Sequence, residues 1–267
     1  MMKRLNLNLF RDSLKFLFRL FFVPQCPVCN EPQATDNICS ACFNAISFLG
    51  AACRKCQEPF EYQVPGVDIC EACNIKHLEF YNSMHCVIKY NETIKNLIVR
   101  YKNQSDFGLG HLFAKWIFNK DQNIFSSAVD DKFNQIILVP VPLFKKRIIK
   151  RGYNQSLLLV RCLSKFSNLS YLNVLERTRD TNSQATKTIA ERADNVKGAF
   201  ALAKQYQSFV RGKNFIIVDD VITTGATLFE CAKILHAAGA KNIELVAIAR
   251  RLKKSHYQKV DLSNEMY

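Results

Sequence analysis

The chain has 267 residues, 48% of them hydrophobic and 22% charged, which is long enough for one ordinary domain and a smaller one and excludes a disordered or low-complexity protein. Its formal net charge of +14 lies wholly beyond residue 85, because residues 1–85 carry 8 basic and 8 acidic side chains. We therefore expect the larger, basic part to attract phosphates or nucleic acid, with a merely well-solvated basic surface as the alternative.

Residues 1–22 are predicted to form an amphipathic helix. Apolar side chains recur on one side at helical spacing and basic side chains lie opposite: Leu7, Phe10, Leu14, Leu17, Phe18 and Phe21 against Arg11, Lys15 and Arg19. Such a helix either docks on the rest of the protein or lies on an anionic surface, which here would be the inner membrane. The apolar stretch LNLNLF is too short for a signal peptide, so we expect a cytoplasmic protein whose cysteines stay reduced.

Residues 23–83 contain four CxxC pairs and little hydrophobic periodicity, which predicts a double zinc-ribbon domain. The pairs are Cys26/Cys29, Cys39/Cys42, Cys53/Cys56 and Cys70/Cys73. Two such pairs supply the four thiolates of a tetrahedral site, so the eight cysteines predict two structural zinc ions with no open coordination position. Disulfides or redox-active pairs are the alternatives. Sequential pairing of the CxxC units is favoured over interleaved pairing, although the spacing allows both.

From residue 84 to residue 250 the pattern changes to alternating strands and helices. Strands are predicted at 84–90, 135–143, 171–175, 215–218 and 242–249, and helices at 91–102, 110–118, 154–166 and 226–240. This alternation predicts an α/β domain with a parallel sheet flanked by helices, whose ligands bind beyond the carboxyl ends of the strands. The isolated Cys86, Cys162 and Cys231 are expected in the core, and the five histidines form no recognisable pair with a serine or cysteine. Residues 251–267 form a polar tail.

The stretch FIIVDDVITTGAT (215–227) is the strongest functional signal. We expect a buried strand to end just before Asp219 and Asp220, so that both carboxylates stand at its carboxyl end and a helix follows. The next residues would form a phosphate cradle of backbone N–H groups and hydroxyls at the helix N-terminus: Thr223, Thr224, Gly225, Ala226 and Thr227. A sugar phosphate satisfies both halves, with its phosphate in the cradle and its hydroxyls on the carboxylates.

The same stretch resembles, at all thirteen positions, the signature of type I phosphoribosyltransferases, which bind 5-phosphoribosyl 1-diphosphate (PRPP) with Mg2+. VPVPLFKKRIIKRGYNQS (139–156), TNSQATKTIAERADNVKGAF (181–200) and the four CxxC pairs, in this order, resemble the ComF family. That family joins a zinc-ribbon region to a phosphoribosyltransferase domain and is associated with DNA uptake in natural transformation. The resemblance covers roughly residues 22–250, with departures at Asn91, Tyr153 and 185–187.

The resemblance gives the basic segments a role. Five basic side chains crowd into seven residues: Lys145, Lys146, Arg147, Lys150 and Arg151. We expect them to form a loop that binds the diphosphate, in which Arg147 and Arg151 are the best catalytic candidates. Arg192 is the third catalytic candidate, because it flanks the segment around Gln184 that is expected to close over the diphosphate. A solvated basic face is the alternative. No dedicated nucleophile is required, because the reaction passes through a ribosyl cation as diphosphate departs.

Two hypotheses follow for the function. In the first, the chain binds Mg-PRPP and single-stranded DNA and acts with other DNA-uptake proteins in natural transformation. The DNA would lie on the same five basic side chains, Lys145, Lys146, Arg147, Lys150 and Arg151. In the second, the chain is a true phosphoribosyltransferase with an unidentified small-molecule nitrogen acceptor. Whether it is an enzyme stays open on the sequence alone.

Overall fold

The computed structural model describes residues 23–33, 38–104, 106–126, 135–181 and 194–252. The chain divides into two compact units, Met1–Ser47 and Phe48–Tyr267, so the third and fourth CxxC pairs belong to the same unit as the sheet. The predicted N-terminal helix and nearly all of the polar tail lie outside the described residues. Within the described part, no helix has the length and apolar character that a membrane span requires.

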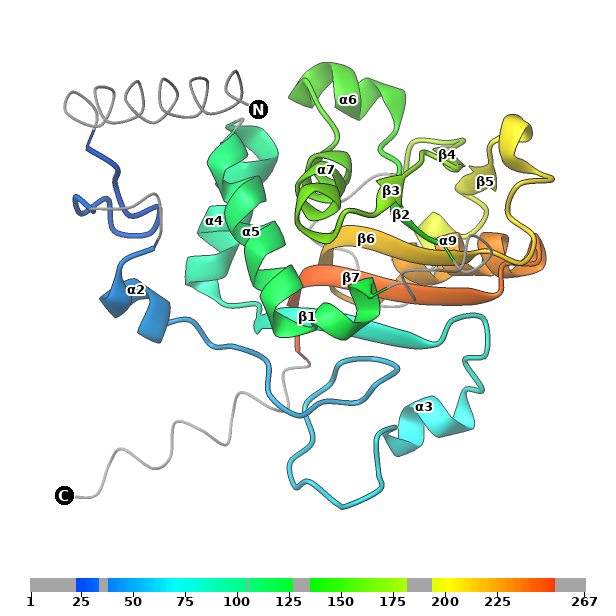
Figure 1. Ribbon diagram of the computed structural model, residues 1–267, viewed down its shortest axis with the longest axis horizontal. Helices are drawn as coiled ribbons and strands as arrows, with labels where there is room; N and C mark the ends of the chain where they lie inside the picture. Colours follow the sequence, from blue (N-terminus) through cyan, green and yellow to red (C-terminus); the bar gives the residue numbers. More distant parts are fainter. Residues whose placement is uncertain (1–22, 34–37, 105, 127–134, 182–193, 253–267) are drawn as a thin grey trace, which may run out of the picture. The chain divides into compact units, whose positions relative to one another are not determined.

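The larger unit is built on a parallel sheet of five strands (Figure 1). In spatial order these are β1 (Ser83–Lys89), β7 (Asn242–Arg250), β6 (Asn214–Ile222), β2 (Ile136–Pro140) and β3 (Ser170–Tyr171). The central strands are near-continuous apolar runs, as expected of strands that are buried on both faces. The predicted parallel sheet is confirmed.

Helices cover both faces of this sheet (Figure 1). On one side lie α4 (Glu92–Asn103), α5 (Phe107–Lys120) and α7 (Gln155–Ser167), and on the other lies α9 (Ala226–Ala237). Phe215 and Ile217 of β6 pack into the same core cluster as Leu228 and Cys231 of α9. Ile216 alternates with them, points to the opposite face and is 0% exposed, so that face is buried as well.

Short elements complete the larger unit. They are α3 (Glu71–Ile75), the 3-10 turns η1 (Gln122–Phe125) and η2 (Lys204–Tyr206), α6 (Lys145–Arg151), and the antiparallel pair of β4 (Leu175–Arg177) and β5 (Phe200–Leu202). Among the isolated cysteines, Cys86 and Cys231 are buried as predicted, whereas Cys162 is only half-buried on α7.

Two strand predictions are wrong. We expected β6 to end before Asp219, but it runs to Ile222, because β7 continues beside it and pairs with it as far as Arg250. The predicted strand 171–175 is instead shared between the end of β3 and the start of β4. Both errors have one cause, since a strand ends where its neighbour stops pairing and not where the local run of apolar residues stops.

The basic segment forms a helix instead of the predicted loop. Helix α6 is followed by Gly152, whose φ of 86° places it in the left-handed conformation that ends many helices. Lysine and arginine are good helix formers, so this sequence is as compatible with a helix as with a loop. As a consequence, Arg147 and Arg151 share one face of the helix and Lys146 and Lys150 share another.

Two knuckles of the same design carry the first and third CxxC pairs. Their sequences are CPVCNEP (26–32) and CRKCQEP (53–59). In each, the residue before the first cysteine bridges to the proline, and the residue after the second cysteine has a positive φ, 63° at Asn30 and 58° at Gln57. The second and fourth pairs each start a short helix, α2 (Ser40–Asn44) and α3. The structural repeat therefore extends beyond the cysteines themselves.

Candidate functional site

The eight paired cysteines form two clusters. One holds Cys26, Cys29, Cys39 and Cys42, the other holds Cys53, Cys56, Cys70 and Cys73, and the Sγ atoms of each cluster lie within 4.8 Å of one another. The fold therefore pairs the CxxC units sequentially. Backbone N–H groups donate to the sulfurs, as from Cys39 to Cys26 at 3.5 Å and from Cys70 to Cys53 at 3.2 Å. A hydrogen bond with the Cys56 thiol lowers the pKa of Cys53 to about 4. Four sulfurs gathered within 4.8 Å of one another fit tetrahedral zinc with no position left open, as in structural sites.

Asp219 and Asp220 lie next to each other in β6 but take different partners. Ser156, at the start of α7, donates from Oγ to Asp219 at 3.1 Å, and Lys102 Nζ, at the end of α4, lies 2.7 Å from Oδ1 of Asp220. Burial, together with the charge of Asp220, raises the pKa of Asp219 to about 7. Oδ2 of Asp220 is buried and has no hydrogen-bond partner among the described residues. A buried acceptor in this state fits a ligand hydroxyl or a metal-bound group.

The residues after β6 form the predicted helix N-terminus, and we call residues 223–227 the TTGAT loop. Helix α9 begins at Ala226, and its N-cap residue, Gly225, has φ 84° and no side chain that could cap the first turn. The hydroxyl of Thr224 accepts a hydrogen bond from the Ala226 N–H at 3.3 Å, and Thr223 and Thr227 are half-buried. Because Gly225 offers no side chain to the backbone N–H groups that follow Ala226, the loop fits an anion.

Two arginines approach this edge of the sheet from other elements. Arg147 of α6 and Arg177 of β4 both donate to Thr181, the first to its carbonyl and the second to its hydroxyl. Burial, followed by the charge of Arg147, lowers the pKa of Arg177, while Asp219 acts in the opposite direction. Nε of Arg177 is buried and lacks a partner among the described residues. Two neighbouring guanidiniums, one with an unused N–H, fit a diphosphate.

The other basic candidates are placed differently. Arg151 donates to Oε1 of Gln155 at 2.6 Å, whereas the lysines of α6 are exposed: Lys145, Lys146 and Lys150. Arg192 lies outside the described residues, so its role stays a prediction. The structure thus associates Arg147 with the ligand edge of the sheet and leaves the three lysines at the surface.

Three residues of the site were not predicted. Ser156 lies inside the quoted segment 139–156, so that motif could have indicated it. Lys102 gave no signal, because a lysine in the last turn of an amphipathic helix is ordinary. Arg250, the last residue of β7, donates to the backbone carbonyl of Thr223 in the TTGAT loop. Only the parallel pairing of β6 and β7 brings these two residues together.

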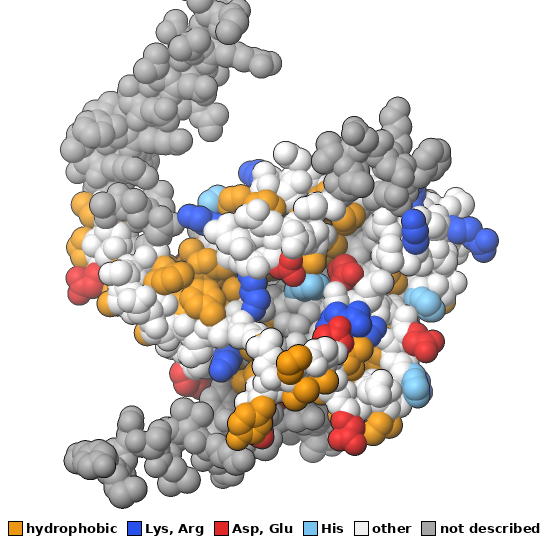
Figure 2. Space-filling model, turned by 60° about the horizontal axis from the view of Figure 1, so that its bottom comes forward, with side chains coloured by type: hydrophobic (Ala, Val, Ile, Leu, Met, Phe, Trp, Pro, Cys, Tyr) orange, Lys and Arg blue, Asp and Glu red, His pale blue; other side chains and the backbone are white. Residues whose placement is uncertain are grey.

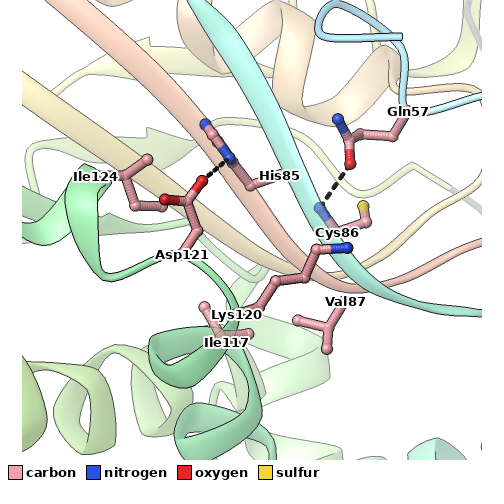
Figure 3. Close-up of a pocket in the computed structure, with 8 residues that line it drawn as sticks. All are labelled: Gln57, His85, Cys86, Val87, Ile117, Lys120, Asp121 and Ile124. Atoms are coloured by element: carbon pink, nitrogen blue, oxygen red, sulfur yellow. Dashed lines mark hydrogen bonds and ion pairs between the residues drawn. The ribbon is translucent and has the colours of Figure 1, made fainter. Parts of the chain in front are cut away.

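A serine and a histidine are in contact at the start of strand β1, away from the carboxyl ends of the strands. The expectation that no histidine pairs with a serine is therefore wrong. Ser83 Oγ lies 2.8 Å from Nε2 of His85, and Nδ1 of His85 lies 2.9 Å from Asp121 (Figure 3). However, the Ser83 hydroxyl also donates to Glu244, and Ser83 is 9% exposed. The hydroxyl is therefore committed to a carboxylate, and the network joins the amino ends of β1 and β7 without forming a nucleophile.

Comparison with known proteins agrees with this architecture. Residues 17–86 match the double zinc ribbon domain, and residues 161–264 match the phosphoribosyl transferase domain. Competence protein F of Haemophilus influenzae is 31% identical over 239 residues, which cover 86% of this chain and 98% of that protein. The chain belongs to the ComF family.

Other members of the ComF family are nearly as similar. Competence protein ComFC of Bacillus subtilis is 26% identical over 210 residues, or 76% of this chain and 80% of that protein. DNA utilization protein YhgH of Escherichia coli (strain K12) is 28% identical over 235 residues, or 85% and 97%. Among solved structures, a hypoxanthine phosphoribosyl transferase of Trypanosoma cruzi matches 60% of this chain and 76% of its own, with 12% identity and a TM-score of 0.32. Because residues 17–86 match the double zinc ribbon domain, the two four-cysteine clusters are the sites of a double zinc ribbon.

Proposed function

We propose that this ComF-family chain binds Mg-PRPP at the carboxyl ends of its strands and handles DNA during natural transformation. The names of its relatives support the second part. One observation carries the first: among the described residues, Oδ2 of Asp220 and Nε of Arg177 are buried without a hydrogen-bond partner, and Arg177 interacts electrostatically with Asp219, shortly before the TTGAT loop. In this proposal Asp219 and Asp220 hold ribose hydroxyls and the loop holds the 5-phosphate. Arg147 and Arg177, with Mg2+, neutralise the diphosphate.

Calorimetric titration with Mg-PRPP tests this proposal. The double variant Asp219→Ala, Asp220→Ala should lose binding and keep its zinc, because both carboxylates lie in the last part of β6 and not in the cysteine clusters. Asp121→Ala is the matched control, since Asp121 pairs with His85 at the opposite edge of the sheet. Equal affinity for wild type and double variant would show that the site does not bind PRPP.

The DNA part of the proposal rests on helix α6. Three exposed lysines lie on it, and Ile149 between them is 83% exposed. Just beyond its end, the ring of Tyr153 packs 5.5 Å from that of Phe107, which is 56% exposed. Exposed lysines for the phosphates and an accessible ring for the bases suit a single strand. By contrast, the face shown in Figure 2 carries basic and acidic side chains interspersed.

A true phosphoribosyltransferase is the second candidate, and the Arg147–Arg177 pair favours it as well. In such a reaction the C1–O bond to diphosphate breaks, a bond from C1 to the acceptor nitrogen forms, and that nitrogen loses a proton. Guanidiniums at the diphosphate would stabilise the leaving group. Release of diphosphate from Mg-PRPP in the presence of candidate bases would support this function. Absence of release with every base, alongside tight PRPP binding, would favour the binding protein. Cytoplasmic location and contact with the inner membrane rest on the sequence alone.

A further inference from the structure

The second knuckle, residues 53–59, is attached to the edge strand β1 of the sheet. Gln57 is 9% exposed, and its Oε1 accepts from the backbone N–H of Cys86 in β1 at 3.1 Å (Figure 3). Its Nε2 donates back to the carbonyl of Cys53 at 3.2 Å. The backbone N–H of Met84 donates to the carbonyl of Arg54 at 2.9 Å. A buried amide that serves both the cysteine turn and the strand fixes one relative to the other.

A polar connection runs from this knuckle to the first residue of the TTGAT loop. Oε2 of Glu58, the residue after Gln57, lies 3.2 Å from Nη2 of Arg250, and the two side chains are only 11% and 6% exposed. The other amino group of Arg250 donates to the carbonyl of Thr223 and lies 3.5 Å from that of Ile222. Removing one partner of a buried ion pair leaves an uncompensated charge, so Glu58 fixes the position of Arg250. Arg250 in turn holds the backbone where β6 enters the loop.

An aromatic connection reaches the middle of the same loop. Tyr81 is 2% exposed, and its hydroxyl donates to the carbonyl of Lys55, inside the knuckle, at 2.6 Å. Its ring stacks on Phe229 of α9, with centroids 5.4 Å apart and planes 22° apart. The Phe229 ring covers Gly225 so closely that a Cβ there would lie 2.7 Å from Cζ. The knuckle therefore contacts two residues that support the loop, Arg250 at Thr223 and Tyr81, through Phe229, at Gly225.

We propose that zinc in the cluster of Cys53, Cys56, Cys70 and Cys73 sets the shape of the TTGAT loop, and so couples the metal site to phosphate binding. This inference rests on the proposed PRPP site. A zinc ion bound by both Cys53 and Cys56 would hold the knuckle closed, and that closure would position Lys55 and Glu58. Without the ion, the acceptor of Tyr81 and the partner of Arg250 both lose their fixed places.

Coupling between two sites is reciprocal. If zinc strengthens PRPP binding by some factor, PRPP must strengthen zinc binding at the second cluster by the same factor. We expect a factor of about ten, within the range that coupled sites typically show. The first cluster belongs to the smaller unit, and its knuckle carries Glu31 at the position of Glu58, exposed instead of buried. Its zinc affinity should not respond to PRPP.

The test is an equilibrium competition for zinc, run on the full-length chain with and without Mg-PRPP. A chelator that prefers zinc to magnesium competes with both clusters, and a full-length Cys39→Ser variant identifies the signal of the second. The expected result is that Mg-PRPP raises the zinc affinity of the second cluster about tenfold and leaves the first unchanged. Equal zinc affinity with and without PRPP, in a protein that binds PRPP, overturns the inference alone. Absence of PRPP binding by the wild type overturns the proposed function as well.

Two variants test the two connections separately. Glu58→Gln removes the charge opposite Arg250 and keeps the shape, and Tyr81→Phe removes the hydrogen bond to Lys55 and keeps the stack on Phe229. Neither residue belongs to the ligand-contacting set, yet each variant should weaken PRPP binding about fivefold or more while still binding zinc. Glu31→Gln is the control and should bind PRPP like the wild type. If Tyr81→Phe and Glu58→Gln both fold and both match this control, the coupling does not exist.

Discussion

Replacing Lys145, Lys146 and Lys150 by glutamine should weaken the salt dependence of single-stranded DNA binding. The three side chains are exposed on α6 and free to reach phosphates, whereas Arg147 and Arg151 donate to Thr181 and Gln155. Each phosphate contact on a single strand contributes roughly 0.7 to the slope of log affinity against log salt, so three lost contacts lower the slope by about 2. Over a fourfold rise in salt concentration, the wild type should therefore lose roughly 20-fold more affinity than the variant does.

Fluorescence anisotropy of a labelled single strand across a salt series measures this slope. Glutamine has nearly the helix propensity of lysine, so the variant should keep α6 intact. Arg147→Gln with Arg151→Gln is the matched control on the other face of the same helix. It should weaken PRPP binding and leave the DNA slope unchanged. If the lysine variant keeps the wild-type slope, the basic helix serves only the diphosphate, and the transferase hypothesis gains.

Three further predictions concern the metal, the carboxylates and the loop. Elemental analysis of protein purified without added metal should find about two zinc ions per chain, and fewer than one with free thiols would contradict the zinc assignment. Folding raises the pKa of Asp219 to about 7, so between about pH 4 and 7 the folded state binds more protons at this residue than the unfolded state does. The stability of the fold, and with it the Tm, should therefore fall as pH rises through that window. Asp219→Asn should remove this fall in Tm, so an unchanged profile would refute the assignment. Gly225 and Gly152 both have positive φ, but of the two only a Cβ at Gly225 would clash with an aromatic ring. Backbone strain should lower the free energy of unfolding of Gly152→Ala by about 1–2 kcal/mol. Urea unfolding should show a larger decrease for Gly225→Ala. Equal losses would refute the clash with Phe229.

The sheet, its main helices and both metal clusters could be predicted because their signals are local. Apolar runs marked β2, β6 and β7, and helical spacing marked α4, α5, α7 and α9. CxxC spacing likewise encodes the zinc geometry within four residues. Sequential pairing of the cysteines was favoured by the sequence but not decided by it, because the connections between successive pairs are similar in length.

Contacts between distant residues account for what the sequence did not predict. The end of β6 depends on β7, and the Lys102–Asp220 and Glu58–Arg250 pairs join segments that only the folded chain brings together. Nothing local distinguishes such charged residues from the many on the surface. Ser83 and His85 were missed for a different reason, since residues two apart on a strand share a face, and that spacing was available in the sequence.

The two knuckles separate the local contribution from the tertiary one. CPVCNEP and CRKCQEP have the same spacing, the same positive φ after the second cysteine and the same bridge to proline, so both can hold zinc by local geometry alone. Yet Glu31 is exposed, whereas Glu58 is buried against Arg250. If the second knuckle served only to bind its metal, nothing would require this glutamate to be buried, because the first knuckle does without it. The burial of Glu58 is therefore explained by Arg250, which it holds against the TTGAT loop. Removal of zinc from the second cluster should weaken PRPP binding more than removal of zinc from the first.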